Sequence, residues 1–293
     1  MTVPLVGKAA IVVQAGVETV EGTGVPATVK LEVLSETLST NATKSEDTGM
    51  RGSLQRFEDN SQLTRKDHTG EIVMLVRHGD LEFLSSSIFG AAAGSYVEEA
   101  KSLTLEIQRG ATVYEYAGVK IDDWKLDLTS GEAIKMTLSV VAFGRTTSAL
   151  TGTLSYSSDV PMTMDSATLS IGGTAREFHS ATFGIRRGLD QDHFVNSLER
   201  TSAVASEFTP YGSAELDYAE ATLDVIALCE AEATTSIVAV VSDGANTMTL
   251  TMAQCAITGA QPTGSDMGVL KYPVEWTALQ SGTEDAVVVT GLN

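Results

Sequence analysis

Two stretches of the chain share one shape, which is a pair of strands with alternating apolar and polar residues around a Gly-containing turn. The first is YEYAGVKIDDWKLDL (114–128) followed by KMTLSVVAF (135–143). The second is MTLTMAQCAITG (248–259) followed by MGVLKYPVEWTAL (267–279). Alternation with a period of two is typical of half-buried β-strands, whose successive side chains point to opposite faces. The pattern therefore predicts antiparallel hairpins and suggests a duplicated unit.

The parts before these hairpins also recur in one order. An early strand, a long polar connection (42–69), a second strand and a short helix precede the first hairpin. The second half has its own long polar connection (189–213) and a strand leading into a helix. Between the halves, GRTTSALTGTLSYSSD (144–159) is rich in Ser, Thr and Gly, which suits a boundary. We expect two tandem domains, residues 1–155 and 156–293.

One stretch in each half has helical rather than strand spacing. In the first half the apolar positions are Leu81, Leu84 and Ile88. We expect Asp80 to cap the start of this helix and Gly90 to end it. In the second half the expected apolar face consists of Leu223, Ile226 and Ala227.

The fold class follows from these elements. Antiparallel strands with one apolar face, plus one helix in each half, predict a mainly β protein. Its two tandem β-sandwich or barrel domains would have similar topology, each with a short flanking α-helix. Trp124 and Trp276 lie in alternating strands, where a core position is expected. No consistent run of Lys or Pro guards the strand edges, which indicates pairing with a partner strand or subunit.

The charge of the chain limits its possible partners. The 293 residues include 38 acidic and 19 basic side chains, a formal net charge of -19. Such a chain repels phosphate backbones and is a poor candidate for wrapping nucleic acid. Two interpretations stay open, namely simple solubility and a surface past which nucleic acid moves without sticking.

Motifs for catalysis or cofactor binding are missing from the sequence. It has no GxSxG elbow, no phosphate-binding loop and no dinucleotide fingerprint opening a helix. The DQDHF segment (190–194) offers oxygen and nitrogen ligands for a divalent cation, but in a polar connection a solvated turn is the favoured interpretation. Cys229 and Cys255 lack metal-ligand spacing and are expected as free thiols. We predict no enzyme activity, no catalytic residues, no metal and no cofactor.

The 42–69 connection mixes both signs of charge densely. Connections this long inside a compact domain usually have a purpose, so we interpret it as an assembly arm rather than a plain surface loop. Its candidate contact residues are Lys44, Glu46, Asp47, Arg51, Arg56, Glu58, Asp59 and Arg65.

Taken together, these parts resemble the tail tube proteins of long-tailed bacteriophages. The resemblance rests on LEVLSETLSTNATKSEDTGMRGSLQ, on the strand and helix of GEIVMLVRHGDLEFLSSSIFG, and on the closing GVLKYPVEWTALQSG, and it covers nearly the whole chain. It implies a virion protein made in the host cytoplasm, whose sheets join side by side into rings that stack into a tube for the genome.

The resemblance also implies finer expectations. Single-domain members form hexameric rings, so a duplicated subunit is expected to close a trimeric, pseudo-hexameric ring, with a hexamer as the fallback. An acidic lumen would keep DNA moving, and Asp122, Asp123 and Asp127 are candidates to line it. Loops in the position of 42–69 would contact the next ring, and tape-measure and tail-tip proteins are expected partners.

Two alternatives are left open. The chain could be a subunit of another tail-like or secretion tube, or a virion-decorating β protein. It could also be a soluble β-class enzyme that uses carboxylates as general acid and base. Only the assembly hypotheses explain the duplication, the missing motifs and the two long connections together.

Overall fold

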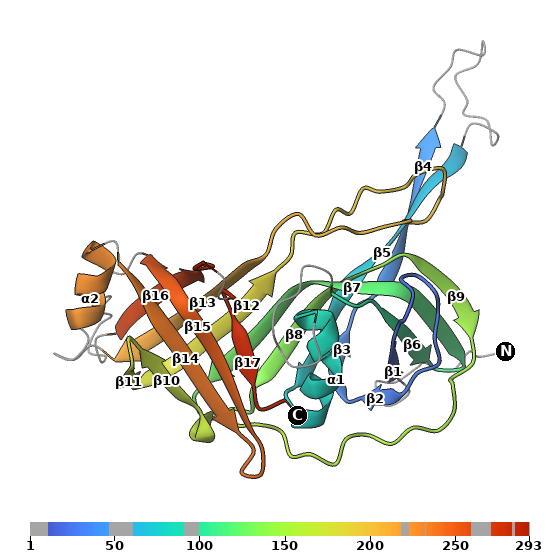
Figure 1. The fold of residues 1–293 in the computed structure, drawn as a ribbon. Helices are drawn as coiled ribbons and strands as arrows, with labels where there is room; N and C mark the ends of the chain where they lie inside the picture. Colours follow the sequence, from blue (N-terminus) through green and yellow to red (C-terminus); the bar gives the residue numbers. More distant parts are fainter. Residues whose placement is uncertain are drawn as a thin grey trace.

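A computed structural model of the chain shows a mainly β protein, with two short α-helices among the residues that it describes (Figure 1). The prediction of a mainly β fold is confirmed. The structure describes residues 11–46, 61–90, 100–217, 223–231, 233–258, 271–282 and 285–292.

The strands and helices follow one another in a similar order in each half. The first half contains β1 (Ile11–Val17), β2 (Val29–Leu31), β3 (Val33–Glu36), β4 (Ser39–Glu46), β5 (Ser61–Leu75), α1 (His78–Ile88), β6 (Leu103–Arg109), β7 (Thr112–Thr129), β8 (Lys135–Ala142) and β9 (Gly144–Ser148). The second half contains a 3-10 turn (Met164–Ser166), β10 (Thr168–Ile171), β11 (Thr174–Arg176), β12 (Phe178–Arg186), β13 (Thr209–Asp217), α2 (Leu223–Glu230), β14 (Thr234–Ser242), β15 (Thr247–Thr258), β16 (Lys271–Ala278) and β17 (Val288–Thr290).

One pairing scheme occurs twice. β1 pairs with β2 and β6, as β10 pairs with β11 and β14. β7 pairs with β6, β8 and β9, as β15 pairs with β14, β16 and β17. β5 then joins β8 to β4, as β13 joins β16 to β12. All of these strand pairs are antiparallel, so the recurrence seen in the sequence is also a recurrence of topology.

The two halves join in one continuous sheet. β12 pairs with β7 from Asp123 to Thr129, which gives the order β4–β5–β8–β7–β12–β13–β16–β15. Four strands of the first half are thus followed by their four counterparts from the second. The division at residue 155 stays a prediction, because the halves are joined through this sheet.

A β-bulge marks the same place in both long hairpins. It falls between Tyr116 and Val119 on β7 and between Met252 and Cys255 on β15. Bulges locally increase strand twist and bend, which suits strands that pass from one sheet into another. On this register Cys255 corresponds to Val119.

The neighbouring strands extend the correspondence. Cys255 pairs with Ala278 on β16. Lys120 pairs with Val141 on β8, so Val119 lies opposite Ala142. Ala278 and Ala142 therefore occupy equivalent positions in the two halves.

The core lies on one side of the continuous sheet. Trp124 and Trp276 are both fully buried, as the sequence predicted. Phe89, at the end of α1, packs edge-on against Trp124 with ring centroids 5.7 Å apart. Helix α1 therefore covers the core side of the first-half strands, and the opposite side of the sheet is left to the polar positions.

The start of α1 differs from the prediction. The N-cap residue is Arg77, which makes no capping side-chain bond, and Asp80 lies buried inside the first turn. The Gly79 amide instead donates to Asp159 Oδ2 at 2.7 Å, so a carboxylate from the segment between the halves satisfies the helix terminus. Gly90 follows the helix with φ +87°, as expected for a helix end.

The apolar face of α2 also differs in detail. Val225 is fully buried, whereas Ala227 is exposed and Ile226 half-buried. Ile226 packs against the core as predicted, and the prediction is wrong for Ala227, because the face that is buried depends on the strands below it.

Candidate functional surfaces

The outer face of the continuous sheet carries polar side chains in register. On β7, Trp124, Leu126 and Leu128 are buried, while the intervening Lys125 and Asp127 are only half-buried. Because side chains alternate across a sheet, these two residues point away from the core. Asp127 accepts a hydrogen bond from Thr182 Oγ1 of β12 at 3.0 Å, which places both side chains on one face across the junction of the halves.

Acids outnumber bases among the charged side chains that the register places on this face. The acids are Glu71, Asp67, Asp123, Asp127, Glu215, Asp217 and Glu275, and the bases are Arg65, Lys120, Lys125, Lys135, Arg186 and Lys271. Several bases are held by acids, as in the pairs Lys125–Asp127 at 2.9 Å and Lys271–Glu215 at 3.0 Å. The face therefore carries a small excess of acids, several of which are paired with bases.

Asp123 is half-buried on this face. Burial raises the pKa of its carboxyl, although the Tyr211 hydroxyl, which donates to Asp123 Oδ1 at 3.0 Å, opposes that effect. The same burial raises the pKa of Tyr211 to about 12. Arg186 lies 3.6 Å from the carboxylate and adds a charge partner.

Asp122 has a different position. It sits at a register shift of β7, and its carboxylate accepts a hydrogen bond from the Leu189 amide at 2.7 Å. Its backbone carbonyl accepts another from the Arg187 amide at 2.8 Å. Of the three residues expected to line the lumen, Asp123 and Asp127 lie on the outer face, whereas Asp122 fixes the start of the connection between β12 and β13.

The described parts of the polar segment 42–69 are two paired antiparallel strands, called here the β4–β5 hairpin. β4 and β5 pair from Ser39–Thr69 to Glu46–Ser61, and Figure 1 shows the two strands projecting from the body of the protein. Lys44 is exposed near the end of its described part. The candidates Asp47, Arg51, Arg56, Glu58 and Asp59 lie outside the described residues, and only the backbone of Glu46 is described.

The second polar connection lies along the base of this hairpin. Figure 1 shows residues 187–208 running from β12 to the hairpin and back to β13. The Lys66 amide donates to the Leu198 carbonyl at 2.7 Å, and Lys66 Nζ lies 3.5 Å from a Glu199 carboxylate oxygen. A segment of the second half is thus held on strands of the first.

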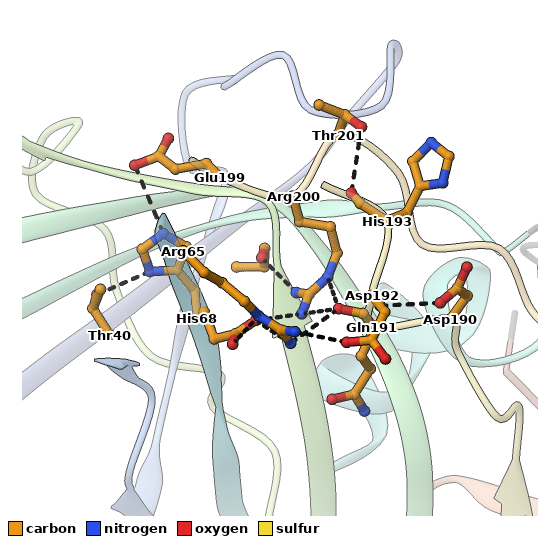
Figure 2. Close-up of polar contacts among 12 residues, drawn as sticks. Thr40, Arg65, His68, Asp190, Gln191, Asp192, His193, Glu199, Arg200 and Thr201 are labelled. Carbon is orange, nitrogen blue, oxygen red and sulfur yellow. Dashed lines mark hydrogen bonds and ion pairs between the residues drawn. The ribbon is translucent and has the colours of Figure 1, made fainter. Parts of the chain in front are cut away.

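Two arginines clamp the connection in place (Figure 2). Buried Arg200 donates to the Ala142 carbonyl and to Asp67 Oδ1, both at 3.0 Å, and to the Gln191 carbonyl at 2.9 Å. Arg65 donates to Asp67 at 2.5 Å and to Asp192 Oδ1 at 2.7 Å. Burial lowers the pKa of Arg200, but the Asp67 carboxylate and the carbonyl acceptors satisfy its charge.

An apolar patch beneath the connection completes the contact. Val141 and Phe143, at the end of β8, form a small buried cluster with Leu189 and Ala203 of the connection, and Ala205 packs against it. The buried cluster and the arginine clamp lie side by side, so the contact has an apolar centre with a charged rim.

A buried histidine borders the clamp. His68 Nδ1 lies 2.9 Å from Thr40 Oγ1, and its Nε2, which has no hydrogen-bond partner among the described residues, is 3.8 Å from Glu199 Oε1 (Figure 2). Burial lowers the pKa of His68, and the nearby Glu199 charge partly offsets this. His68 is therefore held in a site that favours its neutral form.

The DQDHF residues belong to the clamp region. Asp192 pairs with Arg65, and Asp190 accepts a hydrogen bond from the Asp192 amide at 3.0 Å. Within the described residues there is no group of three or more His, Cys, Asp or Glu side chains placed to hold a metal ion. Nor does any helix there have the length and apolar character needed to cross a membrane.

No sequence pattern predicts the arginine clamp. Asp67 and Arg200 are 133 positions apart, and neither stands in a motif. The polar composition of the two connections was visible, but only the register of the sheet brings one of them onto the other.

A protein-family model described as "Phage tail tube protein" matches residues 8–278. No curated protein gives a significant match to the chain.

Proposed function

The chain belongs to the phage tail tube protein family, and on that premise we propose that three copies close a ring whose stacks conduct the genome. The protein is a structural component of the virion tail. Our proposal consists of the trimer, the stacking of rings, the acidic channel and the passage of DNA.

The repeated strand order in the continuous sheet carries the proposal. The order β4–β5–β8–β7 is followed by β12–β13–β16–β15, and the two sets meet through β7 and β12. At the other end of the sheet, β4 pairs only with β5 among the described residues. If β3 and β4 of one copy meet the second half of the next copy as β12 meets β7, the sheet continues from copy to copy. Two equivalent units per chain make three copies a pseudo-hexamer.

The outer face of the sheet is the proposed channel wall. Its acids exceed its bases, and Asp123 and Asp127 stand at the centre of the face, beside the junction of the two halves. Negative charge repels duplex phosphates over a Debye length of about 8 to 10 Å, which disfavours sticking. Asp122, which holds the 187–208 connection, contributes net charge but is not proposed to face the DNA.

The β4–β5 hairpin is the proposed contact to the next ring. It projects from the body, and its exposed Lys44 and the mixed charges of the surrounding segment suit a complementary neighbour (Figure 1). Arg65 is not proposed to contact the next ring, because its guanidinium already donates to Asp67 and Asp192 within the chain.

Electron microscopy of the purified protein, at rising concentration and with salt to screen its charge, tests the proposal. Hollow tubes with three subunits in each ring are the expected result. Rings of six subunits would overturn the trimer, and particles that stay monomeric even with purified tail-tip complex added would overturn tube formation. Deleting residues 47–60 should leave rings but abolish stacks, whereas normal tubes from that variant would overturn the role of the hairpin.

A further inference from the structure

A hollow in the second half lies where the first half is covered. It measures about 320 Å³ and is lined by Phe208, Thr209, Thr277, Ala278, Leu279, Gln280 and Ala286. Leu279 is 46% exposed there, which makes it one of the exposed large apolar residues of the described chain.

The register identifies the counterpart of Leu279. Ala278 corresponds to Ala142, so Leu279 corresponds to the next residue of the first half, Phe143. Phe143 is only 7% exposed, because Leu189 and Ala203 of the 187–208 connection cover it. The same position is thus buried in one half and open in the other.

The covering segment also has a counterpart. His68 on β5 pairs with Ala142 on β8. Tyr211 on β13 pairs with Thr277 on β16, so Pro210 lies opposite Ala278. β5 and β13 therefore correspond at His68 and Pro210.

Five residues before His68 and Pro210 in the chain are Leu63, which lies on β5 beyond a register shift, and Ala205, which lies in the connection before β13. Leu63 pairs with Lys44, and Ala205 forms a bridge with Leu189. The β4–β5 hairpin at Lys44 and Leu63 is therefore built like the part of the connection that covers Phe143. Leu63 itself is half-buried within its own chain.

We propose that Leu63, with the aliphatic stem of Lys44, covers Leu279 of a second copy, as Leu189 and Ala205 cover Phe143 within one chain. The inference rests on the proposed ring and adds to it the residues and the direction of the contact. The β4–β5 hairpin of one copy meets the second half of the next, a head-to-tail contact that closes into a ring. Leu279 and Leu63 supply the apolar centre, and the exposed Lys44 ammonium stays at the rim.

A cysteine pair tests the contact in assembled protein. The double variant Leu63→Cys with Leu279→Cys should form disulfide-linked dimers and trimers on oxidation, and the linked series should stop at three chains. Each single variant, which keeps the native Cys229 and Cys255, is the matched control and should stay monomeric on a denaturing gel. Tubes that form without a 63–279 cross-link would overturn this contact while leaving the tube function intact. Failure of the unmodified chain to form any tube, even with purified tail-tip complex added, would instead overturn the proposed function.

Substitution of Leu279 provides a second, independent measurement. Leu279→Asp should lower the yield of rings at least tenfold, because it places a charge in the apolar centre. Leu279→Phe, which copies the first half, should assemble normally. Val160→Asp is the control, since Val160 is 65% exposed in the segment between the halves and should tolerate the charge. Equal assembly of Leu279→Asp and the unmodified chain would contradict the inference.

Discussion

Gly212 on β13 lies directly opposite Trp276 on β16, and a Cβ atom at Gly212 would come within 2.5 Å of the indole ring. It would also approach the Thr182 carbonyl oxygen at 2.6 Å. In the first half, Gly70 lies opposite Val140 at the equivalent position, where a Cβ would meet the Leu38 backbone at 2.4 Å. Both halves thus need a residue without a side chain at one place in the sheet.

Gly212→Ala should therefore lower the free energy of unfolding by about 2 to 3 kcal/mol, because neither the indole nor the neighbouring strand has room to move. Thermal or urea denaturation measures the change. Ser213→Ala, the next residue on the opposite face, should change it by less than about 0.5 kcal/mol. Equal stability of the two variants would contradict the close approach.

Arg200 is expected to stabilise the 187–208 connection. Arg200→Leu should cost about 3 kcal/mol, because it leaves Asp67 and the Ala142 and Gln191 carbonyls without their donor. Hydrogen exchange at residues 189–205 should accelerate before global unfolding. Arg145→Leu, at an exposed arginine of β9, should leave that exchange unchanged. Unchanged exchange in Arg200→Leu would show that the clamp does not hold the connection.

The buried carboxyl of Asp80 should make the effect of a neutral substitute on the free energy of unfolding depend on pH. Burial raises the pKa of its carboxyl to about 6, so the folded state binds more protons than the unfolded state between about pH 4 and 6. Stability from this group is therefore present at low pH and lost as the pH rises through 6. Asp80→Asn should raise the free energy of unfolding by roughly 1 to 2 kcal/mol at pH 7 and change it little at pH 3.5.

The control for Asp80 is Glu82→Gln, at an exposed position of the same helix. It should show no such difference between the two pH values in thermal denaturation. A stabilisation of Asp80→Asn that is equal at pH 3.5 and pH 7 would point to packing rather than to ionisation.

Titration of His68 should change stability with pH in the opposite direction to titration of Asp80. Its pKa is lowered by burial against its ordinary value of 6.5, so the unfolded state binds more protons as the pH falls below that value. Stability is then present at neutral pH and is lost on acidification. The facing groups are the Thr40 hydroxyl, Tyr116, Glu199, Lys66, Arg145 and Arg200.

On an Asp80→Asn background, which removes the opposing titration of Asp80, His68→Gln should flatten the dependence of the melting temperature on pH between about 5 and 7, while His193→Gln, at an exposed position, should keep it. Both variants are compared with the Asp80→Asn chain. A steep dependence that survives in His68→Gln would assign the titration to another group.

If the outer face lines the channel, reversing its charges should slow the ejection of DNA. Asp127→Lys combined with Glu275→Lys reverses two charges on the outer face and should slow DNA ejection from assembled phage by roughly tenfold, because the wall would then attract phosphates. Glu82→Lys makes the same kind of change on α1, on the core side of the sheet, and should leave ejection unaffected. Equal ejection kinetics for all three particles, measured by dye fluorescence of released DNA, would remove this face from the channel.

The sequence by itself determined the local elements and their repetition. Alternation along 114–128 and 248–259 specified strands, because one buried face requires a period of two. Helical spacing specified α1, and the recurring order of parts indicated the duplication. The family resemblance was visible in the same strands, and the family match to residues 8–278 confirms it.

Only the tertiary structure decided which distant residues meet. Asp159 rather than Asp80 bonds the start of α1, Arg200 reaches Asp67, and Phe143 is covered where Leu279 is not. These contacts depend on strand register and on the junction of β7 with β12. Both are set by the burial of whole faces of the sheet, so no local pattern of residues records them.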